Sequence, residues 1–158
     1  MLGFDDLKRY HEIKEVLEDY AEVLGRIATA KDRAFGAEKL KYIEEERKLL
    51  EEELKAQEKY MEEIESYYAK DANKLLEASN LVQFDKQGRI INYTELQSDK
   101  ELKELMDKYT ETLNLRESAY TEYLNKQYAL IDNQLERIDT KIENSLESTE
   151  RELKYIDY

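Results

Sequence analysis

Apolar residues recur every three or four positions along almost the whole chain, and no proline interrupts them. The first such series is Tyr10, Ile13, Leu17, Tyr20, Leu24 and Ile27. A mean spacing of 3.5 residues places these side chains on one stripe of an α-helix, and such a stripe becomes buried when another helix packs against it. The pattern therefore predicts an all-α protein built from long helices.

Three helical runs are predicted, over about residues 4–35, 37–79 and 93–156. The coiled-coil seam is expected to contain Ile13, Leu17, Leu24, Leu50, Leu54, Met61, Ile64, Leu113, Ile131, Leu135, Ile138 and Ile142. Two four-residue steps follow each other between Ile138 and Leu146, which locally relaxes the supercoil of a coiled coil.

Gly36 lies between the first two runs. A glycine just past the end of a helix adopts the left-handed conformation without a Cβ clash. The favoured interpretation is a tight turn that makes the first two helices antiparallel neighbours, within an elongated three-helix bundle whose third helix overhangs. The alternative is one continuous helix through Gly36, which gives a longer two-helix rod that self-associates.

The sequence FDKQGRIINYTEL, residues 84–96, breaks the helical period. Asp85 and Gly88 occupy the first and fourth places of a type I turn, with a positive φ at the glycine. This chemistry predicts a short β-hairpin at the tip, over about residues 82–91. The next four residues, NYTE, fit a capping box at the start of the third helix. The second and third helices are therefore expected to form an antiparallel coiled coil, with residue 61 facing residue 112.

An isolated two-stranded hairpin is marginally stable in water, so its apolar side chains need a surface to pack on. Phe84, Ile90 and Tyr93 are expected to pack on the neighbouring helix ends. The alternative is that these residues, with the open edges of the hairpin, contact a partner protein.

Charge and composition exclude several functions. The net charge is −13 with no basic stripe, which disfavours nucleic acid and anionic membrane surfaces as partners. No apolar run is long enough to cross a bilayer. The chain has no cysteine and a single histidine, His11, so disulfides, thiolate metal sites and paired histidine ligands are not expected. We therefore predict no catalytic residues, no metal, no cofactor and no enzyme activity.

Several segments together suggest a family. RYHEI near the start, AKDRAFGAEKLKYIEEE, FDKQGRIINYTEL and the final LKYIDY occur in this order. The chain resembles, over about residues 8–158, the helical body of tail tape measure proteins of bacteriophages that infect Gram-positive bacteria. The FDxxGxIxNYxEL pattern is the most specific of these elements. Members of that family are usually several times longer, so the sequence is interpreted as a single elongated domain, 1–158, from a longer protein.

The resemblance implies a structural rod that helps set tail length and occupies the lumen of the tail tube, assembled in the cytoplasm of the host bacterium. Its partners would be further copies of itself, other tail proteins or assembly chaperones. The alternative function is a stand-alone coiled-coil adaptor, located in the cytoplasm, whose hairpin tip recognises a partner protein.

Overall fold

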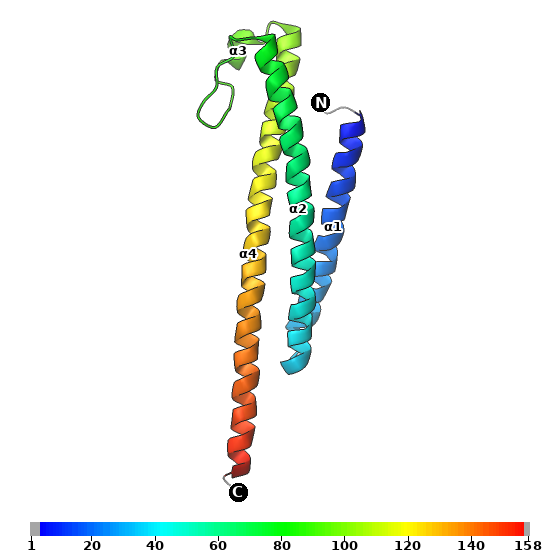
Figure 1. Ribbon diagram of the computed structural model, residues 1–158, viewed down its shortest axis with the longest axis vertical. Coiled ribbons are helices and arrows are strands. Elements are labelled where there is room, and N and C mark those ends of the chain that lie inside the picture. The colour runs from blue at the N-terminus through cyan, green and yellow to red at the C-terminus, as the bar shows by residue number, and fades with distance from the viewer. Residues whose placement is uncertain (1–3, 157–158) are drawn as a thin grey trace. The chain divides into compact units, whose positions relative to one another are not determined.

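A computed structural model describes residues 4–156, and the side chains of residues 9 and 11–155. It contains the helices α1 (Phe4–Asp32), α2 (Gly36–Ala78), α3 (Tyr93–Leu96) and α4 (Lys100–Ile156) (Figure 1). No strand occurs among the described residues. The predicted all-α class is therefore confirmed.

The chain folds as two compact units whose boundaries fall inside the long helices. The first unit contains Gln57–Tyr123 and the described part of Met1–Lys14. The second unit contains Glu15–Ala56 and the described part of Leu124–Tyr158. Each unit thus takes one segment of α1, one of α2 and one of α4.

In the first unit, α2 and α4 run in opposite directions. Gln57 Nε2 donates to the carbonyl oxygen of Ala119 at 2.9 Å. Eight residues further along α2, Glu65 accepts a 2.7 Å hydrogen bond from Arg116, which lies earlier in α4. Met61 therefore lies opposite residues near 118 rather than 112, about two helical turns from the predicted register. The difference arises because the connection continues well beyond Gly88 before α4 begins.

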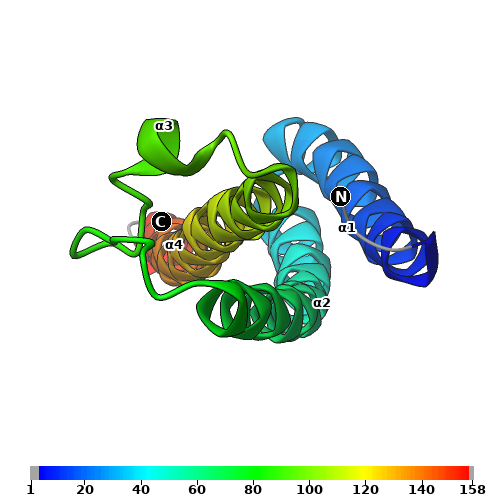
Figure 2. The ribbon, with the colours of Figure 1, turned by 90° about the horizontal axis from the view of Figure 1, so that it is seen from above.

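The core of the first unit lies at the end where α2 and α4 are connected. Figure 2 shows this connection, with α3 in it, from above. Its buried members come from α2, from the connection and from the first turns of α4: Leu75, Val82, Leu102, Met106, Tyr109 and Leu113. Burial of apolar side chains is the main favourable term in folding, so this cluster is what holds the connection against the two helices.

In the second unit, segments of α1, α2 and α4 pack together. The chain reverses between α1 and α2, where Gly36 has a φ of +58°. Before it, the amide of Ala34 donates to the carbonyl oxygen of Lys31 at 3.1 Å and closes the end of α1. The predicted turn is present, and the alternative of one continuous helix through Gly36 is wrong.

The third predicted run is interrupted at residues 97–99. Asp99 caps α4, because its Oδ1 accepts a hydrogen bond of 3.2 Å from the amide of Leu102. The predicted capping box at Asn92 is wrong, since this side chain makes no cap hydrogen bond to α3. Its amide group is used elsewhere: Oδ1 accepts from the amide of Gln83 at 2.9 Å and Nδ2 donates to the carbonyl oxygen of Leu81 at 2.8 Å.

The predicted β-hairpin is also not formed as a pair of strands. Phe84 and Ile90 make one isolated antiparallel bridge. Only two backbone hydrogen bonds link the two arms, Asp85 N to Arg89 O at 2.9 Å and Ile91 N to Gln83 O at 3.0 Å. Beyond them, the side chain of Asn92 forms the hydrogen bonds to Gln83 and Leu81. The backbone ladder therefore does not extend further.

Candidate functional site

The turn at residues 85–89 is fixed by its own aspartate. Asp85 Oδ1 accepts hydrogen bonds from the amides of Gln87, at 2.8 Å, and Arg89, at 2.9 Å. The carbonyl oxygen of Asp85 accepts from the amide of Gly88 at 3.1 Å. Gly88 has a φ of +82°, the positive value that the sequence pattern predicted. Local hydrogen bonds of this kind stabilise a turn without help from a sheet.

A cluster of aromatic side chains packs against the turn. Tyr109 donates a hydrogen bond of 2.5 Å to the carbonyl oxygen of Gly88, and its hydroxyl lies 3.3 Å from that of Tyr68. The ring of Phe84 meets the ring of Tyr109 edge-on, with centroids 5.5 Å apart. Burial and the hydrogen bond with Tyr68 raise the pKa of Tyr109, so this hydroxyl stays protonated and remains a donor.

The three apolar residues singled out in this stretch are half-buried against the core of the first unit: Phe84, Ile90 and Tyr93. Tyr93 also donates a hydrogen bond of 2.8 Å to Asp107. This bond lowers the pKa of Asp107 and raises that of Tyr93. The geometry thus places these residues in packing positions.

Other apolar residues near the connection point into solvent. Leu76 at the end of α2, Leu81 in the connection and Ile91 beyond the turn are 60%, 64% and 62% exposed. They are not members of the cluster that packs beneath the turn. If the connection contacts a partner protein, these side chains are the ones available for it.

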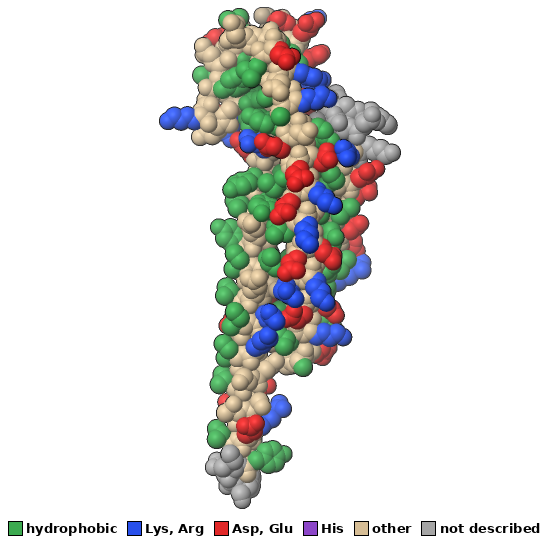
Figure 3. All heavy atoms as spheres, viewed as in Figure 1, with side chains coloured by type: hydrophobic (Ala, Val, Ile, Leu, Met, Phe, Trp, Pro, Cys, Tyr) green, Lys and Arg blue, Asp and Glu red, His purple; other side chains and the backbone are tan. Residues whose placement is uncertain are grey.

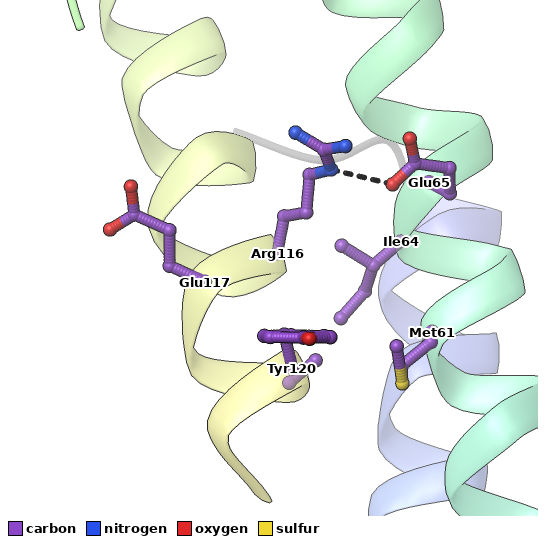
Figure 4. Close-up of a pocket in the computed structure, with 7 residues that line it drawn as sticks. Met61, Ile64, Glu65, Arg116, Glu117 and Tyr120 are labelled. Atoms are coloured by element: carbon purple, nitrogen blue, oxygen red, sulfur yellow. Dashed lines mark hydrogen bonds and ion pairs between the residues drawn. The ribbon is translucent and has the colours of Figure 1, made fainter. Parts of the chain in front are cut away.

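A second feature of the first unit is a cavity of about 340 Å³ between α2 and α4 (Figure 4). Met61, Ile64 and Tyr120 face one another across it, and the ion pair of Arg116 with Glu65 lies above them. The guanidinium of Arg116 also lies 4.7 Å from the centre of the Tyr68 ring. This lining offers apolar contact and one charge pair, without a nucleophile aligned with a base.

The predicted seam residues divide into three groups. Deeply buried are Leu50, Ile64 and Leu113. Half-buried are Ile13, Leu17, Leu24, Leu54 and Met61. Between 50% and 55% exposed are Ile131, Leu135, Ile138 and Ile142. Within the chain, the other helices leave this last group of predicted seam residues uncovered.

The physical reason lies on the opposite side of α4. Asn133 is 2% exposed, and its Nδ2 donates to the carbonyl oxygen of Ile43 at 3.1 Å and to Glu46 Oε1 at 2.7 Å. Thr140, one heptad later, is also 2% exposed. In the second unit, α4 therefore meets α2 through polar residues. A 3.5-residue stripe identifies a helix face that favours burial, but it does not say which helix covers that face.

A buried charge cluster accompanies this contact. Lys31 Nζ lies 3.0 Å from Glu46 Oε2 and 2.8 Å from Glu136 Oε2, so one cation from α1 links α2 and α4. Burial alone lowers the pKa of Lys31, but its hydrogen bonds to Glu136 and Glu46 outweigh that effect and raise it. The lysine is therefore charged at neutral pH and fixes how the three segments meet.

Apolar periodicity does not identify Lys31, Asn133 and Thr140, because none of them is apolar. The signal in the sequence was the spacing of Asn133 and Thr140, which are seven residues apart and each midway between two predicted seam residues. Gln57, a polar residue of α2, is fully buried and donates a hydrogen bond to the carbonyl oxygen of Ala119.

These features define an all-α protein. Compared with protein-family models, curated proteins and solved structures, the chain matches none. Among the described residues, no cluster of His, Cys, Asp and Glu has the arrangement of a metal site. None of the described helices combines the length and apolar character needed to cross a membrane.

Proposed function

We propose that this chain is a structural, non-enzymatic helical segment of a bacteriophage tail tape measure protein. It would occupy the lumen of the tail tube and help to set tail length. The observation that carries the proposal is the length of its helices: α4 alone contains 57 residues, which corresponds to about 86 Å at 1.5 Å per residue. A protein that measures distance needs a length proportional to residue number, and a helix supplies that proportionality.

The antiparallel contacts of α2 with α4 support the finer part of the proposal, an elongated antiparallel coiled coil that includes three helices over part of its length. The net charge of −13 is compatible with this role, because a net charge far from zero keeps a protein soluble. Partners in this proposal are other tail proteins and assembly chaperones in the bacterial cytoplasm, and neither nucleic acid nor membrane.

The test is an in-frame deletion of residues 36–156 from the gene that encodes the chain, with phage tails measured by electron microscopy. Tails should be shorter by up to about 86 Å, the length of the longest helix removed. A control gene carrying Arg26→Lys, an exposed position on α1, should leave tail length unchanged. Deletion tails of normal length, or a coding genome without tail genes, would refute the proposal.

A second candidate function, a stand-alone adaptor, is favoured by the exposure of Leu81 and Ile91 in the connection. The double variant Leu81→Ser/Ile91→Ser distinguishes the two. Loss of a co-purifying protein with an unchanged melting temperature would support the adaptor. Retention of every partner, together with normal tails, would exclude it. Phe84→Ser is the matched control for stability, since Phe84 packs on the core.

A further inference from the structure

One face of α4 in the second unit carries a continuous row of exposed apolar side chains. This row, named the α4 stripe, consists of residues that are 50–63% exposed: Tyr128, Ile131, Leu135, Ile138, Ile142, Leu146 and Leu153. Figure 3 shows hydrophobic side chains gathered in a column along this part of the chain. The stripe extends over more than three heptads, the length at which such a pattern indicates a coiled coil.

The helices of the same unit do not cover the α4 stripe. Two residues along a helix correspond to a rotation of about 200°, so Asn133 lies on the side of α4 opposite Ile131 and Leu135. Asn133 is the residue buried against α2, and Thr140 repeats that position one heptad later. The α2 contact and the stripe therefore occupy opposite faces of α4.

The last described turns of α4 extend beyond the packing of the second unit. Every residue from Ser145 to Tyr155 is exposed, so this segment has no packing partner within the unit. The apolar residues Leu146 and Leu153 of this segment are 58% and 55% exposed, so the unit leaves the end of the stripe uncovered as well.

The charged residues beside the α4 stripe indicate which kind of helix packs against it. Asp132 and Asp139 line one side of it, and Gln134 and Lys141 line the other. When two copies of such a helix pair in parallel, the acidic side of each copy lies beside the neutral-to-basic side of the other. In an antiparallel pair, the acidic sides would face each other. Residues in these flanking positions set the orientation of a coiled coil.

We infer that the α4 stripe binds the α4 stripe of a second copy of this chain, parallel and in register. The inference goes beyond the proposed function and does not depend on it. Two copies provide stripes of equal length and matched register, and they bury the side chains that the second unit leaves exposed. The pairing also supports the helix from Ser145 to Ile156, which has no other neighbour in the unit.

Sedimentation equilibrium of the whole chain tests the inference. The wild type should have at least twice the monomer mass of 18.9 kDa, and Leu135→Gln/Ile138→Gln should reduce it to the monomer mass with most helix content retained. The matched control is Val16→Gln/Val23→Gln, since these valines are exposed apolar residues of α1 outside the stripe; it should keep the wild-type mass. A monomeric wild type at roughly 0.1 mM, or a stripe variant with wild-type mass, would overturn the inference.

Orientation is tested with single cysteines, because the chain contains none. Tyr128→Cys and Leu153→Cys place a thiol near either end of the α4 stripe. In a parallel pair in register, each variant should form a disulfide-linked dimer with itself on mild oxidation. Crosslinks that form only when the two variants are mixed would show an antiparallel pair and overturn the parallel arrangement.

Discussion

The hydroxyl of Tyr109 donates a hydrogen bond of 2.5 Å to the carbonyl oxygen of Gly88. A side chain of α4 thus holds the turn that reverses the chain between α2 and α4. A Cβ added to Gly88 would lie 3.1 Å from Tyr109 Oη and 3.6 Å from Tyr68 Oη, at a φ of +82°. Both the backbone conformation and the space beneath it therefore require glycine.

Gly88→Ala should lower the free energy of unfolding by about 2 kcal/mol, because a left-handed conformation costs an L-residue roughly 1–2 kcal/mol and the Tyr109 hydroxyl must also move. The measurement is urea denaturation followed by circular dichroism. Gly25→Ala is the control: a Cβ there meets nothing within 4 Å, and alanine in a helix is more stable than glycine by up to about 1 kcal/mol. Equal stability of Gly88→Ala and the wild type would show that the turn is not held as described.

Asn92→Ala should destabilise the connection. The side chain of Asn92 satisfies the amide of Gln83 and the carbonyl oxygen of Leu81, and it is 8% exposed. Leaving two such groups without partners costs roughly 1–3 kcal/mol. The amide of Gln83 should exchange with solvent faster in this variant, which NMR hydrogen exchange measures. Asn80→Ala, at an exposed position of the same connection, should leave that rate unchanged; equal rates in both variants would contradict the role of Asn92.

Local chemistry explains which parts of the fold could be predicted from the sequence. The helical runs follow from apolar spacing, and the reversals at Gly36 and Gly88 follow from glycines that take positive φ. The start of α4 was misplaced, because Asn92 and Asp99 are both good N-cap residues. Only the three-dimensional structure shows that the Asn92 side chain is already engaged with Leu81 and Gln83.

The polar packing of the second unit could not be predicted for a different reason. Apolar periodicity identified Leu135 and Ile138 as a seam, whereas α4 contacts α2 through the buried Asn133. A buried polar contact depends on specific partners, here the carbonyl oxygen of Ile43, and these come from a segment about ninety residues away in sequence. No local pattern reports such a pairing.

Lys31→Met should destabilise the second unit, because it removes the cation that pairs with Glu46 and Glu136. Removing one partner of a fully buried pair costs about 3–5 kcal/mol. We expect about 2 kcal/mol here, since the Glu136 side chain is 33% exposed and solvent screens part of its charge. Arg26→Met, which breaks an exposed pair with Glu22, should change stability by less than about 1 kcal/mol.

The pH dependence of the Lys31 contribution has a defined sign. Its folded-state pKa is raised above the ordinary 10.5, so the folded protein binds this proton more tightly than the unfolded chain does. The contribution is complete below the unfolded pKa and is lost as pH rises through the folded one. The gap in melting temperature between the wild type and Lys31→Met should therefore narrow above about pH 10.5. A gap that widens there would contradict the ion cluster.

Glu53 is a buried group whose charged form destabilises the fold, in contrast to Lys31. It lies on α2 in the second unit and is 6% exposed. Burial raises its pKa, and the charge of Lys126 only partly offsets this. A carboxyl group with a raised folded-state pKa favours folding in its protonated form. Its favourable contribution is present below the unfolded pKa and is lost as pH rises through the folded pKa, so burial of the charged form of Glu53 destabilises the fold.

Glu53→Gln should therefore stabilise the protein at pH 7, by about 0.5–1 kcal/mol, because the amide keeps the shape of the carboxyl group without the cost of burying a charge. The gain should shrink as pH falls through the raised folded-state pKa and be absent below the ordinary carboxyl pKa of 4.5, since Glu53 is then neutral in the wild type as well. Thermal melts at pH 7 and at low pH measure the two differences. Glu52→Gln, at the exposed neighbouring position, should change stability by less than about 0.5 kcal/mol at either pH. A Glu53→Gln variant less stable than the wild type at pH 7 would mean that Lys126 more than compensates the buried charge.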